Sequence, residues 1–208
     1  MGLLSIICFI SITLAAPAAG EASGPQSRNR LKNDTIRAAS EPSYPPFCIV
    51  NESGEADGFS VELLRAAAAA VHREVIFRVD SWQQIKEDLA RGRIDALPLV
   101  ARSPFREEKF DFTFPYHTMK GAVFVREDNS SIKEVSDLKN LRVAVMRGDN
   151  AHEYISRFGV SDNVHETETF REAFEQLSAG RHDAVIAQKL MGLQLLKEMG
   201  ISNLNVLD

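Results

Sequence analysis

Arg106 is a residue of this chain whose side chain can bind a negatively charged group. It lies in the polar stretch Ser103–Lys109. The planar guanidinium of arginine can donate two parallel hydrogen bonds to one carboxylate. Its neighbours Glu107 and Glu108 are simpler partners, and position alone favours an ordinary ion pair with one of them on a solvated turn.

Gly148, Asp149 and Asn150 form a second candidate site. They follow the apolar stretch Leu141–Met146 and begin a predicted helix that runs to about Phe158. Free backbone N–H groups at the start of a helix favour an anion. Asp149 leaves two alternatives open, because its carboxylate either repels an acidic ligand group or caps the helix.

Other patterns that carry chemistry are absent from the sequence. The five histidines show no paired ligand spacing and there is no cysteine cluster, so we expect no metal and no cofactor. No nucleophile elbow and no phosphate-binding loop occurs, and we expect this chain not to be an enzyme. The net charge of −5 argues against nucleic acid as a partner.

Two segments of the chain repeat each other. Leu89–Leu99 reads LARGRIDALPL, and Leu177–Ala187 reads LSAGRHDAVIA. In each, a helix ends at Leu, a Gly-Arg pair interrupts the chain, and Asp-Ala begins a short apolar strand of the kind buried in parallel sheets. Such units recur in any α/β protein, but their repetition also fits two similar α/β lobes with a ligand cleft between them.

The first 20 residues differ from the rest of the chain. Leu3–Ala16 is apolar and uncharged, and small residues follow it. Residues 1–20 therefore predict a signal peptide or anchor, although no Lys or Arg precedes the apolar stretch and a buried helix is the alternative. Residues 21–34 predict a linker. We expect export to the periplasm, which leaves Cys48 as a lone cysteine in a buried strand.

The remaining sequence alternates strands and helices, which predicts βαβ units and a mainly parallel sheet. We expect a first lobe over residues 35–125, a crossing at 126–131 and a second lobe over 132–208. The segment Phe110–Pro115 alternates aromatic and polar residues, which predicts a half-buried strand. The helix Ser60–His72 should bury one side, made of Val61, Leu63, Leu64, Ala67, Ala68 and Val71. Further strands are expected over Thr35–Ser40, Cys48–Val50, Val75–Val79, Ile94–Val100, Gly121–Arg126, Leu141–Met146, Asp183–Ala187 and Leu204–Leu207, and further helices over Trp82–Ala90, Phe170–Ala179 and Gln188–Met199.

An ordered set of short motifs resembles the periplasmic solute-binding proteins of family 3, which have the two-lobed Venus-flytrap fold. The motifs are Tyr44-Pro45-Pro46-Phe47, Gly58–Leu63, Gly92–Ala96, Phe110–Tyr116 after Arg106, Asp137-Leu138-Lys139, Val143–Gly148 and Gly180–Ala184. Within that family the chain looks most like the sensor domains of membrane histidine kinases. The resemblance implies an extracytoplasmic domain that binds a small polar ligand.

The resemblance also implies roles for individual residues. Arg106 then matches the arginine that holds the ligand carboxylate, which reverses the preference for a surface ion pair. The other ligand-binding positions that it implies are Tyr44, Phe47, Trp82, Leu99, Ala101, Gly148, Asn150, Ala151 and Gln188. Tyr44 and Phe47 match aromatic walls, with packing on the first lobe as the alternative, and Trp82 fits core or wall equally.

Gln188 departs from the family pattern. Family members that bind amino acids often have an aspartate there, which holds the α-ammonium group, and a neutral amide cannot neutralise that charge. A carboxylate ligand without a free ammonium group is therefore at least as well matched as a standard α-amino acid.

The expected partner is either a membrane signalling module, such as a kinase encoded beyond Asp208, or the permease of an ABC importer. A dehydratase on the same fold is a third, weaker alternative. The fold normally crosses back to the first lobe, so we expect that the sequence is incomplete at its C-terminal end and that the first lobe lacks an element.

Overall fold

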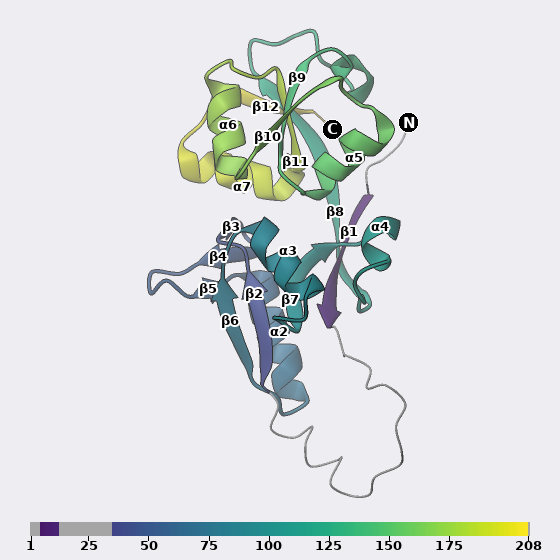
Figure 1. Cartoon of the computed structure of the whole chain (residues 1–208). Coiled ribbons are helices and arrows are strands. Elements are labelled where there is room, and N and C mark those ends of the chain that lie inside the picture. The colour runs from purple at the N-terminus through teal and green to yellow at the C-terminus, as the bar shows by residue number, and fades with distance from the viewer. Residues whose placement is uncertain (1–4, 13–34, 208) are drawn as a thin grey trace, which may run out of the picture. The chain divides into compact units, whose positions relative to one another are not determined.

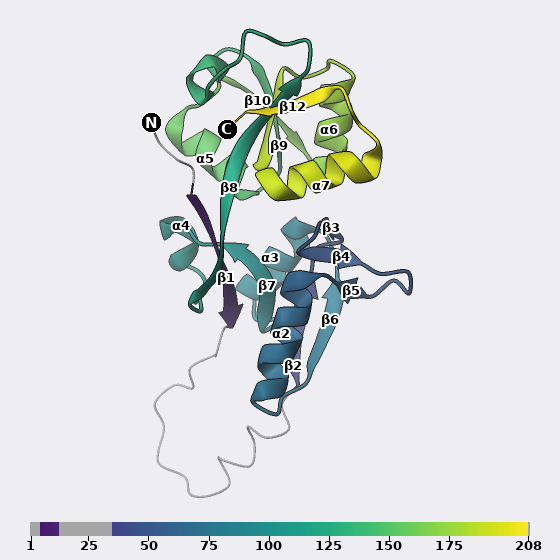
Figure 2. The same ribbon diagram turned by 180° about the vertical axis from the view of Figure 1, so that it is seen from behind.

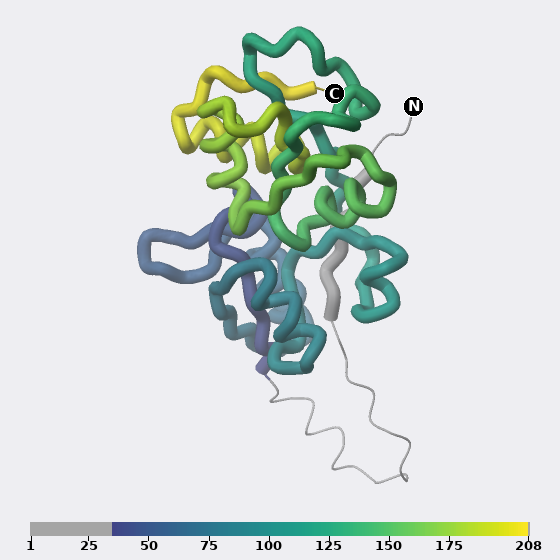
Figure 3. Tube along the Cα trace, turned by 45° about the horizontal axis from the view of Figure 1, so that its top comes forward, coloured from purple at the N-terminus to yellow at the C-terminus, as the bar shows by residue number. Residues whose placement is uncertain are grey.

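The computed structural model describes residues 5–12 and 35–207, which form two compact units (Figure 1). Cys8–His117 makes up the N-terminal unit, and Thr118–Asp208 makes up most of the C-terminal unit. The division lies inside the long strand β8 (Pro115–Arg126), before the predicted crossing at residues 126–131. Figure 3 follows the chain through the first unit in blue and teal and through the second in green and yellow.

The N-terminal unit is built on a parallel sheet with the strand order β6-β2-β7. Strand β1, within the predicted leader, pairs antiparallel with β7. Because βαβ crossovers are right-handed, α2 and α3 cover opposite faces of this sheet (Figures 1 and 2). The elements are β1 (Ser5–Ile12), β2 (Ile36–Ser40), β3 (Ser43–Tyr44), β4 (Cys48–Val50), β5 (Ala56–Asp57), α2 (Phe59–Ala70), β6 (Val75–Val79), α3 (Trp82–Ala90), β7 (Ala96–Ala101) and α4 (Pro104–Glu107).

The C-terminal unit repeats this plan. Its parallel strands have the order β10-β9-β11, and β8 continues the sheet antiparallel to β11, with β12 antiparallel to β8. Helix α5 joins β9 to β10, and α6 joins β10 to β11. The elements are β8, the 3₁₀ helix η1 (Val135–Leu138), β9 (Arg142–Met146), α5 (Asn150–Phe158), β10 (Asn163–Thr167), α6 (Phe170–Ser178), β11 (Ala184–Gln188), α7 (Lys189–Met199) and β12 (Leu204–Leu207).

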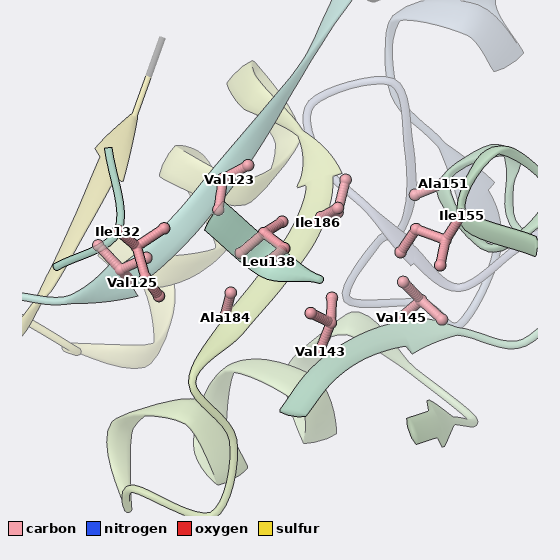
Figure 4. Packing of buried hydrophobic residues seen from close by; sticks show 10 residues of the cluster. All are labelled: Val123, Val125, Ile132, Leu138, Val143, Val145, Ala151, Ile155, Ala184 and Ile186. Carbon is pink, nitrogen blue, oxygen red and sulfur yellow. The ribbon is translucent and has the colours of Figure 1, made fainter. Parts of the chain in front are cut away.

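The central strands β9 and β11 of the C-terminal unit bury both of their faces, as the apolar runs in the sequence predict. One face packs against Ala151 and Ile155 of α5 (Figure 4). On the other face, the ring of Phe124 lies edge-on to Phe174 of α6, with ring centroids 4.9 Å apart. The first cluster consists of Val123, Val125, Ile132, Leu138, Val143, Val145, Ala151, Ile155, Ala184 and Ile186.

The repeated sequence forms the same contact in each unit: its aspartate accepts hydrogen bonds from the backbone and side chain of one arginine. We call this contact the clamp. Asp95 accepts hydrogen bonds from the backbone N–H of Arg37 (2.9 Å), from its Nε (3.0 Å) and from its Nη2 (2.6 Å). Asp183 accepts from the same three atoms of Arg142 at 2.9, 3.1 and 2.8 Å. In both clamps, Nη2 also donates to the glycine carbonyl three residues before the aspartate. The predicted strands after Asp95 and Asp183 therefore occupy equivalent positions.

One predicted element is wrong and one element was missed. Phe110–Phe114 is not a strand, and Phe114 is 94% exposed, because the aromatics lie in a loop before β8 rather than along a sheet. Strand β10 was not predicted, because it is an edge strand with mostly exposed side chains and lacks an apolar run. The buried side of α2 is also narrower than predicted: Ala67 and Val71 are exposed, because only the stripe through Val61, Leu64 and Ala68 faces the sheet.

Candidate functional site

Three candidate residues of the N-terminal unit follow the carboxyl ends of its parallel strands. Tyr44 comes after β2, Trp82 after β6, and Arg106 after β7. In open α/β sheets this edge is where ligands bind, because the loops there are free to vary while the strands hold them in place. Ala101 ends β7, and Leu99 lies two residues earlier, where it is buried.

Arg106 is buried, with 3% of its surface exposed, so it does not lie on a solvated turn. Its Nη1 donates a hydrogen bond of 3.1 Å to the carbonyl oxygen of Ala101. Its guanidinium carbon lies 5.4 Å from the centre of the Trp82 ring. The neighbour Glu107 pairs instead with Arg102. A buried guanidinium held against an aromatic face is the arrangement expected of an anion anchor.

Ser103 positions Arg106 and was not among the predicted site residues. Its hydroxyl and its carbonyl both accept from the Arg106 backbone N–H, and it caps α4. The sequence signal was present, since Ser-Pro is a common start of a helix.

Two cationic side chains lie over the ring of Trp82. In addition to Arg106, the Nζ of Lys86 lies 5.2 Å from its ring centre. Trp82 is 7% exposed and begins α3, with Ser81 as the helix cap. Trp82 is buried, as the core alternative predicts, and its ring supports Arg106.

Tyr44 and Phe47 belong to a cluster of rings. Phe47 contacts Tyr44, Phe59 and His117, with ring centroids 6.4, 6.3 and 5.4 Å apart respectively. Both residues are buried, and the peptide bond between Pro45 and Pro46 is cis. The packing of Phe47 within its own unit matches the alternative of a structural aromatic.

The candidate residues of the C-terminal unit also follow carboxyl ends of parallel strands. Gly148, with φ 66°, follows β9, and its N–H donates to Nδ1 of His152 at 3.0 Å. Asp149 caps α5 by accepting from the N–H of Ala151 at 2.8 Å. The capping alternative for Asp149 therefore holds. Asn150 is half-buried at the first position of the helix.

Gln188 ends β11 and caps α7. Its Oε1 accepts from the backbone N–H of Met191 at 2.5 Å, and its side chain is buried. The amide oxygen is thus engaged within the unit, and the NH₂ group is the end of the side chain that could contact a ligand.

The described residues contain no group of three or more His, Cys, Asp and Glu side chains arranged to hold a metal ion. Within residues 5–12 and 35–207, no helix combines the length and the apolar character needed to span a membrane.

Comparison with known sequences places residues 36–154 within the bacterial extracellular solute-binding proteins, family 3. A probable amino-acid ABC transporter-binding protein of Haemophilus influenzae is 28% identical over 176 residues, which is 84% of this chain and 68% of that protein. The L-cystine-binding protein TcyJ of Escherichia coli K12 is 29% identical over 174 residues, or 82% of this chain and 65% of the relative. The chain therefore spans about two thirds of these relatives.

Among solved structures, the fold is similar to a histidine kinase sensor domain with similarity to periplasmic binding proteins. The TM-score is 0.82 at 30% identity, over 86% of this chain and 78% of that one. This likeness confirms the predicted periplasmic-binding-protein fold.

Proposed function

Because this chain belongs to the family 3 bacterial extracellular solute-binding proteins, we propose that it binds a small carboxylate-bearing or amino-acid-like ligand outside the cytoplasm. The observation that carries the proposal is the buried Arg106, supported by Trp82 at the carboxyl edge of a parallel sheet. The relatives compared above are binding proteins, and we propose that this chain too binds without catalysing a reaction.

Arg106 is proposed to anchor the ligand carboxylate. Nη1 donates to the carbonyl oxygen of Ala101 and the guanidinium lies over the ring of Trp82, and both contacts restrain the side chain. A pre-oriented donor loses less side-chain entropy when it binds, and a charge-assisted pair away from water is strong. Tyr44, Phe47 and Leu99 are proposed as apolar contacts beside it.

The C-terminal unit is proposed to bind a polar or anionic group through residues of its own. Gly148, Asn150 and Ala151 lie at the start of α5, where backbone N–H groups favour negative charge. Gln188 adds a neutral amide in place of a carboxylate. We therefore favour ligands without a free ammonium group.

Isothermal titration calorimetry tests the anchor. The chain is titrated with L-cystine, L-arginine and L-glutamine and with the dicarboxylates succinate and malate, at pH 7.5. Arg106→Ala should abolish binding of the ligand that the wild type takes, because removing one partner of a buried charge pair costs about 2–5 kcal/mol. Arg102→Ala is the matched control, since Arg102 is exposed and pairs with Glu107. Unchanged affinity in Arg106→Ala would refute the assignment of the anchor.

Gln188→Asp tests the inference about the ammonium group. The added negative charge should raise affinity for α-amino acids and lower affinity for dicarboxylates. Tight binding of a common α-amino acid by the wild type would contradict this inference while leaving the role of Arg106 intact.

We further propose that ligand binding here signals to a membrane protein rather than feeding an importer. The similarity to a histidine kinase sensor domain, at a TM-score of 0.82, favours the sensor. The relative from Haemophilus influenzae supports the alternative, a binding protein of an ABC importer. Sequencing the gene past the codon for Asp208 distinguishes them. A membrane span followed by a kinase or cyclase module is expected for the sensor, and an early stop codon for the importer.

A further inference from the structure

The two clamps allow positions in the two units to be compared one by one. Arg37 corresponds to Arg142 and Asp95 to Asp183, and the residue before each aspartate is Ile94 or His182. Seven residues before each aspartate, the chain has Asp88 in α3 and Gln176 in α6. The strand registers, Arg37 opposite Ile76 and Arg142 opposite Asn163, make Arg78 equivalent to His165.

At these positions the N-terminal unit has a buried ion-pair cluster. Asp88 is 1% exposed, and it pairs with Arg78 and with Nε of Arg93 at 2.5 Å. Gln84 donates a further hydrogen bond to Asp88 at 2.9 Å. The carboxylate is therefore compensated from several sides, as a buried charge must be.

The C-terminal unit has histidines and an amide at these positions instead. Nε2 of His182 lies 2.5 Å from Oε1 of Gln176, and the Nε2 of Gln176 donates to Glu172 at 3.0 Å. This second bond turns Oε1 of Gln176 toward the imidazole, so Nε2 of His182 carries the proton and donates. Nδ1 of His182 is then an acceptor, and it is buried without a hydrogen-bond partner.

The surroundings of His182 are unfavourable for a positive charge. The ring of His165 lies 4.8 Å from its own, centre to centre. The carbonyl oxygen of His182 accepts from Arg126 at 2.9 Å. Of the two carboxylates among the described groups around it, Asp183 is clamped by Arg142 and Glu172 accepts from Gln176. The groups around it are His165 of β10, Arg142 of β9, Gln176 and Glu172 of α6, Arg126 of β8, and Arg181 and Asp183 of its own turn.

We propose that His182 is a pH-sensitive element of the C-terminal unit, and that its protonation in mild acid weakens the turn that carries Asp183. A proton on Nδ1 would create a buried donor without an acceptor, next to His165, Arg142 and Arg181. This turn connects α6 to β11 and is bonded to β9 and β8, so its loosening affects the sheet as a whole. The proposal does not depend on any ligand.

The direction of the pH dependence follows from the folded state. Burial first, and then the charges of His165 and Arg142, hold the pKa of His182 below its ordinary value of 6.5. The unfolded chain therefore binds a proton that the folded chain does not, once the pH falls below about 6.5. The stability that the chain gains from keeping His182 neutral is complete above that pH, and it is lost as the pH falls toward the pKa of His182 in the folded chain.

Urea unfolding of the whole chain at pH values from 7.5 to 5.0 tests the proposal. His182→Ile installs the residue of the equivalent position, Ile94. The unfolding equilibrium constant of the wild type should rise more steeply on acidification than that of His182→Ile, by up to tenfold per pH unit for one extra proton. His72→Asn, at an exposed position of the N-terminal unit, should follow the wild type.

Nitrogen-15 NMR of the histidine side chains tests the proposal on the wild-type chain as well. At pH 7.5 His182 should be the Nε2–H tautomer, with a titration midpoint below 6.5, and His165→Ala should raise that midpoint. Parallel stability profiles for wild type and His182→Ile would overturn the proposal. So would an Nδ1–H tautomer, or a midpoint at or above 6.5.

Discussion

Gly192 of α7 is a position where adding one methyl group should destabilise the C-terminal unit. A Cβ at Gly192 would clash with Cζ of Phe124 and would lie 2.8 Å from its Cε2. Phe124 is fully buried, and Phe174 packs edge-on against its ring. The ring therefore has no space into which it can move, so Gly192→Ala forces a rearrangement of the core.

Two effects of opposite sign decide the magnitude. Alanine is favoured over glycine inside a helix by about 1 kcal/mol. Overpacking a dense core typically costs about 1–3 kcal/mol, and a contact this short belongs at the upper end. The expected net loss for Gly192→Ala is thus about 2 kcal/mol in the free energy of unfolding.

Urea unfolding followed by circular dichroism at pH 7.5 measures this loss. The control is the double variant with Phe124→Leu, because leucine lacks the ring atoms that the new Cβ would meet. Phe124→Leu alone should destabilise the unit, and adding Gly192→Ala to it should cost much less than in the wild type. Gly192→Ala at wild-type stability or above would refute the reasoning.

Three further changes test local features of the fold. Gly58→Ala should destabilise the N-terminal unit by about 2 kcal/mol or more, since φ is 101° and the new Cβ would lie 2.7 Å from the carbonyl oxygen of Phe47; urea unfolding checks this. Asp149→Ala should cost about 1 kcal/mol through the lost cap of α5, with Asp149→Asn near wild type in the same assay. The hydrogen bond from Arg37 holds the pKa of Asp95 below 3.8, so the stability that the Asp95 carboxylate contributes is present above that pH and is lost as acid protonates it. Acid unfolding of Asp95→Asn should lack this loss of stability, and an acid transition identical to that of the wild type would contradict the prediction.

The sequence predicted the fold best where local chemistry and tertiary structure agree. The Gly-Arg-x-Asp-Ala repeat combines a helix end with a buried strand, and both lie where they were expected. The clamp that its aspartate makes with an arginine was not predicted. Strand β10, with the sequence NVHET, gave no such signal. Its strand character comes from pairing with β9, which an apolar pattern does not record.

The candidate site was predictable in part. Arg106, Gly148 and Gln188 lie at carboxyl edges of parallel strands, as strand and helix order alone implies. What the sequence did not reveal is how side chains are used within each unit. The amide oxygen of Gln188 caps α7, and the ring of Trp82 supports Arg106. The sequence did not predict these two contacts, because they depend on the distance between groups in the folded chain rather than on residue type.

The position of the Arg106 guanidinium over the Trp82 ring gives the chain an intrinsic optical probe. Trp82 is the sole tryptophan in the sequence, so all indole emission arises beside the proposed anchor. The excited indole is strongly dipolar, and its emission wavelength responds to charges over the ring. A carboxylate that neutralises the guanidinium changes that field, so candidate ligands can be screened by fluorescence on the unlabelled chain.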